Sequence, residues 1–143
     1  MTKEISSLQN DLVNEIIHLQ EKSRIRKEKG LFVIEGNREI SLAIEGGYKL
    51  KYVLFCEEII SQKMLHKTLS TYPDKRPELI KISLKVYQKI AHRKKTEGIV
   101  AVAISKRMSL NDLSFNENPL ILVAEASEKP GNIGALLRTA DAA

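Results

Sequence analysis

Residues 31–55 read LFVIEGNREISLAIEGGYKLKYVLF, a strand, a helix and a second strand in succession. Leu31–Ile34 is an apolar run, and Leu50–Phe55 alternates in polarity as a strand does. Between them, Arg38–Glu45 has helical spacing of apolar residues and stops at Gly46-Gly47, a common helix terminator. A strand, a helix and a strand in this order indicate an α/β domain.

The same alternation extends in both directions from this stretch. We expect a first helix capped by Ser6 or Ser7, followed by a basic connector at residues 22–30. Further elements are expected at Glu57–Leu69 (helix), Leu79–Ile82 (strand), Ser83–Ile90 (capped helix) and Ile99–Ile104 (strand). This order predicts a three-layer α/β sandwich with a mainly parallel sheet over residues 1–105. Polar residues 106–118 are expected to be a linker before residues 119–143.

The last stretch predicts one more strand and helix. Leu120–Val123 is a continuous apolar run, which suits a strand covered on both faces. Pro130-Gly131 provides a turn, and Asn132 can cap the helix that opens there. Arg138 lies one turn after Gly134, where a guanidinium can reach a phosphate or a developing oxyanion. The alternative is an ordinary strand–helix unit with a solvated arginine.

Two basic clusters are candidates for contact with an anionic partner. The chain carries a formal net charge of +5 and a pI near 9.3, which fits such a partner without proving one. The clusters are Arg24, Arg26, Lys27 and Lys29, and then His92, Arg93, Lys94 and Lys95. Both can equally be solvated loops, the second one favoured by a helix C-terminus. Aromatic residues make up only 5%, which argues against an extended stacking platform. Tyr72 and Tyr87 can still stack locally on bases, but we expect core or edge packing for both.

Several classes of protein are disfavoured by what the sequence contains. The single Cys56 allows neither an internal disulfide nor a cysteine zinc cluster, and we expect it to be a buried small hydrophobe. No histidine pair has metal-ligand spacing, so no metal is expected. The absence of a long apolar run and of a signal peptide predicts a cytoplasmic protein without a membrane span. A phosphate-binding α/β protein is a weaker alternative, because the P-loop pattern is missing.

Two sets of motifs resemble one known family, the SpoU/TrmH branch of the SPOUT RNA methyltransferases. The C-terminal set is Pro130, Asn132, Gly134, Arg138, Thr139 and Ala140, with Lys129 where the family usually has Asp. The N-terminal set resembles the substrate-binding domain of the same enzymes, which is similar to a small ribosomal RNA-binding protein. It comprises Ile5-Ser6-Ser7-x-Gln9-Asn10, Phe32-Val33-Ile34-Glu35-Gly36-x-Arg38 and Thr96–Val102.

The resemblance implies an enzyme that transfers a methyl group from S-adenosylmethionine to a ribose 2′-hydroxyl of rRNA or tRNA. It places Arg138, Asn132 and Glu125 at the catalytic site. It adds Arg38 to the two basic clusters as a residue that contacts RNA. The cofactor would occupy a knotted domain formed by residues after Ala143, through which such enzymes form homodimers.

We therefore expect residues 1–105 to be an RNA-binding domain and residues 119–143 to be the start of a truncated methyltransferase domain. No cofactor-binding residue and no bound cofactor are expected in this chain, which should at most bind RNA. The alternative is a non-catalytic RNA-binding module with a ribosomal-protein-like fold, complete in itself.

Overall fold

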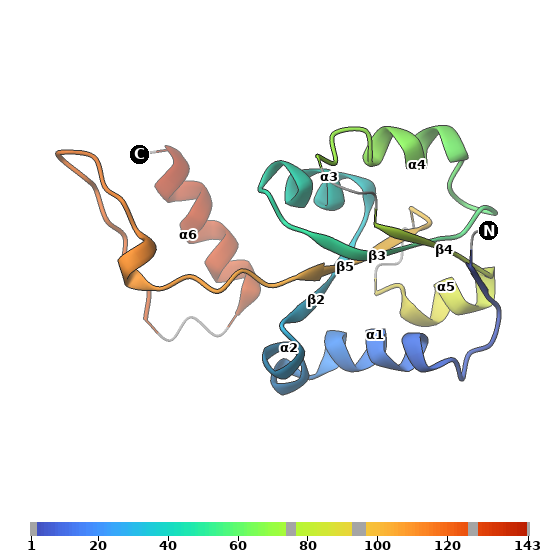
Figure 1. Ribbon diagram of the computed structural model, residues 1–143. Coiled ribbons are helices and arrows are strands. Elements are labelled where there is room, and N and C mark those ends of the chain that lie inside the picture. The colour runs from blue at the N-terminus through green and yellow to red at the C-terminus, as the bar shows by residue number, and fades with distance from the viewer. Residues whose placement is uncertain (1–2, 74–76, 93–96, 126–128, 143) are drawn as a thin grey trace. The chain divides into compact units, whose positions relative to one another are not determined.

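The computed structural model describes residues 3–73, 77–92, 97–125 and 129–142. By contacts between its residues, the chain divides into two compact units, Met1–Arg107 and Met108–Ala143. In the first unit (Figure 1), strands and helices follow one another along the chain. They are β1 (Lys3–Ile5), α1 (Asp11–Glu21), α2 (Ser23–Lys29), β2 (Leu31–Glu35), α3 (Asn37–Glu45), β3 (Leu50–Phe55), α4 (Gln62–Thr68), β4 (Glu78–Ile82), α5 (Leu84–Ile90) and β5 (Ile99–Ile104).

The sheet has five strands in the order β1-β4-β3-β5-β2 and is mixed. β4 is parallel to β1 and β3, whereas β5 is antiparallel to both β3 and β2. The prediction of a mainly parallel sheet is therefore confirmed only in part, because β1, β2, β3 and β4 run in one direction and β5 runs against them. Alternation of element types does not fix where a strand enters the sheet. Here β5 begins with Ile99 opposite Phe55, at the carboxyl end of β3, and runs back between β3 and β2.

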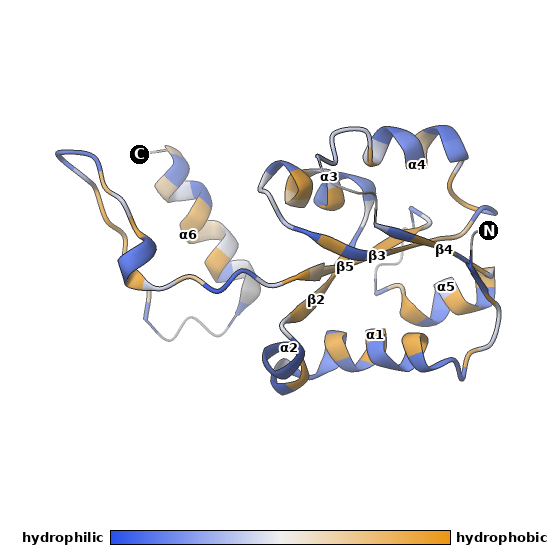
Figure 2. Cartoon of the chain, in the orientation of Figure 1, coloured by the Kyte–Doolittle hydropathy of each residue, from blue (hydrophilic) through white to orange (hydrophobic). Residues whose placement is uncertain are grey.

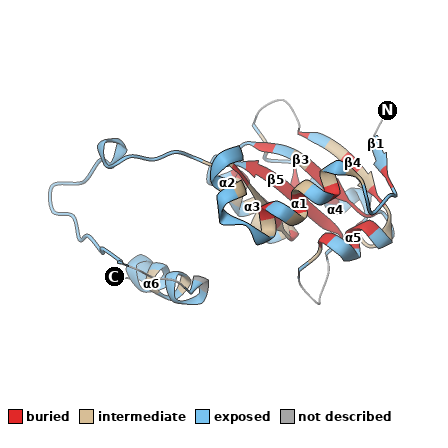
Figure 3. Ribbon diagram, turned by 90° about the horizontal axis from the view of Figure 1, so that it is seen from below, coloured by how far each residue is buried: buried red, intermediate tan, exposed pale blue. Residues whose placement is uncertain are grey.

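Helices cover both faces of this sheet, giving three layers. One core joins α1 and α5 to the sheet, with Ile16, Leu54 and Ile90 almost fully buried. The other core joins α3 and α4 to the opposite face, with Ile40 and Leu65 buried. The orange apolar stripes of α1 and α3 face the sheet in Figure 2, and the buried residues concentrate on the strands and inner helix faces in Figure 3.

The N-terminal region differs from the expectation in two ways. Residues 3–5 form β1, so α1 begins later, at Asp11, and Asn10 caps it by accepting a hydrogen bond from the Leu12 N–H at 3.0 Å. The expected cap at Ser6 or Ser7 was wrong, because those residues follow directly on β1. The expected basic connector contains the helix α2, which ends at Gly30 with φ of 62°.

α4 is shorter than the predicted helix and begins at Gln62 rather than Glu57. Ser61 determines this start, since its hydroxyl accepts a hydrogen bond from the Met64 N–H at 3.2 Å. The predictions for β3, β5 and the Ser83-capped helix α5 are confirmed.

The second unit contains the short 3-10 helix η1 (Leu110–Asp112) and α6 (Pro130–Ala142). The predicted strand at Leu120–Val123 is not formed, because the described part of this unit contains no other strand with which it could pair. α6 begins at Pro130 rather than at Asn132, in keeping with the preference of proline for the first helical position. Asn132 therefore lies inside the first turn and is not the cap.

Among the described residues, no helix combines the length and the apolar character needed to span a bilayer.

Candidate functional site

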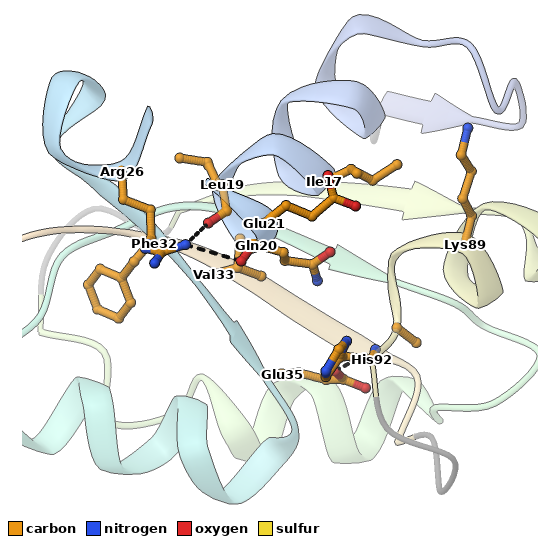
Figure 4. A pocket seen from close by; sticks show the side chains of 11 residues that line it. Ile17, Leu19, Gln20, Glu21, Arg26, Phe32, Val33, Glu35, Lys89 and His92 are labelled. Carbon is orange, nitrogen blue, oxygen red and sulfur yellow. Dashed lines mark hydrogen bonds between the residues drawn. The ribbon is translucent and has the colours of Figure 1, made fainter. Parts of the chain in front are cut away.

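An open groove runs along β2, the edge strand on one side of the sheet. It consists of two pockets of about 860 and about 490 Å³ that share Arg26 and Phe32. We call the two together the β2 groove. The larger pocket (Figure 4) is lined by Ile17, Leu19, Gln20, Glu21, Arg26, Phe32, Val33, Glu35, Lys89, Ala91 and His92. The smaller one adds Ser23, Lys27, Gly30, Ser105 and Arg107.

Arg26 joins the two pockets and also stabilises the fold. Its Nη1 donates hydrogen bonds to the carbonyl oxygens of Leu19 at 2.7 Å and Gln20 at 3.1 Å, as Figure 4 shows. These carbonyls belong to the last turn of α1, where no further helical N–H is available to them. Arg26 is thus a half-buried anchor between α1 and α2 as well as a wall of the β2 groove.

The other three members of the first basic cluster differ in whether a carboxylate pairs with them. Arg24 forms an ion pair with Glu28 at 2.7 Å, and Lys29 forms one with Glu15 at 2.6 Å. Lys27 is exposed and forms no ion pair with another described residue. Of the four predicted contacts, Lys27 is therefore the cation that the fold leaves available in the groove.

The opposite end of the β2 groove is formed by the chain that follows α5. The Glu35 carboxylate accepts a hydrogen bond from the His92 N–H at 2.9 Å (Figure 4). Arg93, Lys94 and Lys95 lie outside the described residues, but the described residues on both sides are fixed. After them, the Glu97 carboxylate accepts hydrogen bonds from the Asn37 N–H at 2.6 Å and the Asn37 side chain at 3.0 Å. His92 lines only the larger pocket and Lys27 only the smaller one, so these two residues, distant in sequence, line different parts of one groove.

Two Glu-Gly pairs, Glu35-Gly36 and Glu97-Gly98, meet at this end of the sheet. The Gly36 N–H donates to the Ile99 carbonyl at 3.3 Å, which places the two pairs side by side. Gly98 has φ of 76°, and a Cβ there would lie 2.9 Å from the Ile60 backbone nitrogen. Only glycine fits without strain. We call this region, residues 35–38 with 97–98, the Glu-Gly corner.

Tyr87 supports the Glu-Gly corner from inside the core. It is 0% exposed, and its hydroxyl oxygen accepts a hydrogen bond from the Gly98 N–H at 2.9 Å. Burial raises the pKa of the Tyr87 phenol, and the charges of Glu35 and Glu97 raise it further. The expectation that Tyr87 packs in the core is confirmed. Cys56 is also fully buried, as predicted, and burial raises the pKa of its thiol.

Arg38 lies on the other side of the Glu-Gly corner, in the first turn of α3. It is exposed and forms no ion pair with another described residue. The hydrogen bonds from Asn37 to Glu97 fix the start of this helix, and Arg38 directly follows Asn37.

The sequence did not point to Phe32, Ser105 or Arg107 as groove residues. Phe32 reads as one more apolar residue of a strand, and Arg107 falls in the expected linker. The hydrogen bond from the Ser105 N–H to the Gly30 carbonyl, at 2.8 Å, extends the strand-like contact and places Arg107 next to α2.

The predicted catalytic residues belong to the second unit. Asn132 and Arg138 are exposed on α6, six residues apart, so they do not share a face of the helix. Glu125 precedes residues 126–128, which are outside the described part. Their catalytic roles stay predictions. Within the described residues, no three His, Cys, Asp or Glu side chains are grouped so that they could hold a metal ion.

The fold and the matched region define a class of protein, the N-terminal substrate-binding domain of SpoU/TrmH RNA 2′-O methyltransferases. The model of the MRM3-like substrate binding domain family matches residues 10–101, more than half of the chain. The chain belongs to this family.

Relatives and solved structures agree with this assignment. The 23S rRNA (uridine(2479)-2′-O)-methyltransferase of Streptomyces viridochromogenes is 28% identical over 118 residues, covering 82% of this chain and 40% of that protein. The 23S rRNA (guanosine-2′-O-)-methyltransferase RlmB of Vibrio parahaemolyticus is 43% identical over 58 residues, covering 37% of this chain and 24% of that protein.

Among solved structures, an RNA 2′-O ribose methyltransferase superposes with a TM-score of 0.76 at 32% identity, covering 97% of this chain and 52% of that one. The SpoU methyltransferase AviRb from Streptomyces viridochromogenes, in complex with AdoMet, gives 0.80 at 26% identity, covering 94% and 50%. The chain thus spans about half or less of the proteins that it matches.

Proposed function

We propose that residues 1–107 bind the RNA substrate of an rRNA 2′-O-ribose methyltransferase, and that the β2 groove is the contact surface. The observation that carries this proposal is the convergence of Lys27, Arg26 and Arg107 around one open groove with a partly exposed phenylalanine. The proposal is supported by membership of a substrate-binding domain family and by the rRNA substrates in the names of two relatives.

The smaller pocket of the groove suits a nucleotide. Lys27 and Arg107 offer cations to backbone phosphates, and no carboxylate lines this pocket. The Phe32 ring, held edge-to-face against Tyr48 at a centroid distance of 5.4 Å, gives the wall an apolar surface on which a base or ribose can rest. Lys106 lies over the Tyr48 ring at 4.6 Å and donates to the Gly46 carbonyl, which fixes the chain where it leaves β5.

The methyl donor of such an enzyme is S-adenosylmethionine, which supplies the methyl group for the ribose oxygen. The described residues of the second unit do not fit this cofactor, because nearly all their side chains are exposed to solvent. We therefore assign no step through the cofactor to this chain. For the catalytic site we propose Arg138, whose guanidinium would stabilise negative charge developing on the 2′-oxygen, with Asn132 and Glu125 shaping the loop before it.

RNA titrations at several salt concentrations test the groove. Replacing one cation that contacts a phosphate lowers the slope of log affinity against log salt by about 0.7–0.9. We expect this change for Lys27→Ala and for Arg107→Ala with a structured 23S rRNA fragment. Lys63→Ala is the control, because Lys63 is exposed on α4, away from the β2 groove. If both groove variants keep the slope of Lys63→Ala and of the unmodified chain, the groove is not the RNA surface.

A further inference from the structure

A second hollow lies on the other face of the sheet, between α3 and the end of α4. Its volume is about 330 Å³, and we call it the α3–α4 crevice. Two cations, Arg38 and Lys67, line it together with the hydroxyl-bearing residues Ser41, Ser70 and Thr71. Glu45 is the acidic residue of the lining, so the formal charge of the crevice is positive.

The charged groups of the α3–α4 crevice are available to a ligand. Arg38 and Lys67 are both exposed, and neither forms an ion pair with another described residue. The Ser70 hydroxyl donates to the Lys67 carbonyl at 2.8 Å, which holds the turn after α4 against the helix end. Arg38 and Lys67, with the Ser41 and Thr71 hydroxyls around a small open hollow, form a set of donors that suits the oxygens of a phosphate.

The frame that carries these groups is rigid. Thr68 is only 4% exposed, and its hydroxyl lies 2.9 Å from the Asn37 side-chain oxygen and 3.0 Å from the Met64 carbonyl. Asn37 is bound in turn to the Glu97 carboxylate. The last turn of α4, the start of α3 and the Glu-Gly corner are therefore connected by hydrogen bonds. Because the helix ends are fixed, Arg38 and Lys67 start from a preorganised position.

The α3–α4 crevice begins where the β2 groove ends. Glu35 of the Glu-Gly corner binds the His92 N–H at the end of the groove, and Arg38 of the same corner lines the crevice. We infer that the crevice binds a phosphodiester of the substrate RNA, so that the strand crosses the Glu-Gly corner from the β2 groove to α4. This inference rests on the proposed RNA-binding function and adds a second contact on the opposite face of the sheet.

Salt-dependent RNA titrations with Lys67 variants of the whole chain test the crevice. Lys67→Ala should lower the slope of log affinity against log salt by about 0.7–0.9, and the double change with Arg38→Ala by roughly twice as much. Lys67→Arg keeps the charge and should restore the slope. Lys63→Ala, on the same helix but outside the crevice, should leave the slope unchanged. Unchanged thermal unfolding of each variant shows that the fold is intact.

The outcomes separate this inference from the proposed function. If Lys27→Ala and Arg107→Ala lower the slope while Lys67→Ala behaves as Lys63→Ala does, the crevice contact is refuted and the groove stands. If none of the variants changes the slope, both proposals fail. Titration of inorganic phosphate, followed through the amide signals of residues 67–71, tests whether the crevice binds free phosphate and not a phosphodiester of RNA. Saturable phosphate binding without any effect of Lys67→Ala on RNA would overturn the assignment to RNA.

Discussion

Leu31–Ile34 and Leu120–Val123 are both four-residue apolar runs, yet the first lies in a paired strand and the second is exposed. In the first run Leu31 is 5% exposed and Ile34 is 9% exposed, whereas Leu120 and Val123 are 86% and 83% exposed. The first run pairs with β5 along its whole length, from Leu31 opposite Ile104 to Ile34 opposite Ala101. The second has no strand beside it among the described residues of its unit.

The difference shows that an apolar run is a requirement for a strand and not a sufficient cause. A strand needs neighbours that take up its N–H and C=O groups, and its side chains need a covered face. Residues 1–107 provide both through five strands and two helical layers. The described part of residues 108–143 provides one helix and a 3-10 turn. The two units should therefore respond very differently to the same substitution. Two pairs of variants and one pH comparison test this.

The largest effect is expected for the same leucine truncation in the two units. Leu54 is 0% exposed in the core beneath α1 and α5. Leu54→Ala removes buried methyl groups and leaves a cavity, which should lower the free energy of unfolding by about 2–5 kcal/mol. Leu120→Ala should change it by less than about 0.5 kcal/mol, because the side chain is already in water. Urea denaturation followed by circular dichroism measures both. A cost at Leu120 equal to that at Leu54 would contradict the contrast.

The second-largest difference is expected for glycine-to-alanine changes, which should destabilise the first unit at Gly98 and stabilise the helix of the second unit at Gly134. Gly98 has φ of 76° and a Cβ there would meet Ile59 and Ile60 at 2.9 Å, so Gly98→Ala should cost about 1–3 kcal/mol. Gly134 lies within α6 with nothing within 4 Å of its Cβ position. Gly134→Ala should favour that helix by about 1 kcal/mol. Denaturation reports the first effect and the far-ultraviolet helix signal the second. Equal stability of the two variants would show that the Glu-Gly corner can relax.

The smallest effect is a pH dependence confined to the first unit. Burial, followed by the charges of Glu35 and Glu97, raises the pKa of Tyr87 above its ordinary value of 10.0. The folded chain then keeps the phenol proton at pH values where the unfolded chain loses it. The contribution is complete below about pH 10 and is lost as the pH rises above that value.

Unfolding midpoints between about pH 8 and about pH 11 measure this dependence. Tyr87→Phe has no ionisable group at this position, so its midpoint should fall less steeply with pH once the difference at neutral pH is subtracted. Identical pH profiles for the two proteins would mean that the phenol ionises alike in the folded and unfolded states.

The sequence analysis identified several residues that line the candidate site, but it identified them in separate segments and not as one site. Arg26, Lys27 and His92 were predicted as members of basic clusters and Arg38 through the family resemblance, and all four line hollows of the structure. The sequence did not show which of the predicted basic residues the fold leaves available to a ligand. Arg26 binds the end of α1 and Lys29 pairs with Glu15 because the packing of α2 against α1 brings those groups within reach, whereas Arg24 pairs with Glu28 one turn away in the same helix. No sequence pattern marked Phe32 or Arg107 as a residue of the groove, since Phe32 reads as a strand residue of a family motif and Arg107 as linker.

The sequence by itself determined most of the helices and most of the strands, because periodicity, caps and glycine stops act over a few residues. It determined the family through motifs in a fixed order. Only the tertiary structure decided that β5 runs antiparallel between β2 and β3, that Glu35 and Glu97 meet at one corner, and that Leu120–Val123 stays unpaired. Each of these depends on contacts between residues distant in the chain, and such contacts leave no local pattern from which they could be predicted.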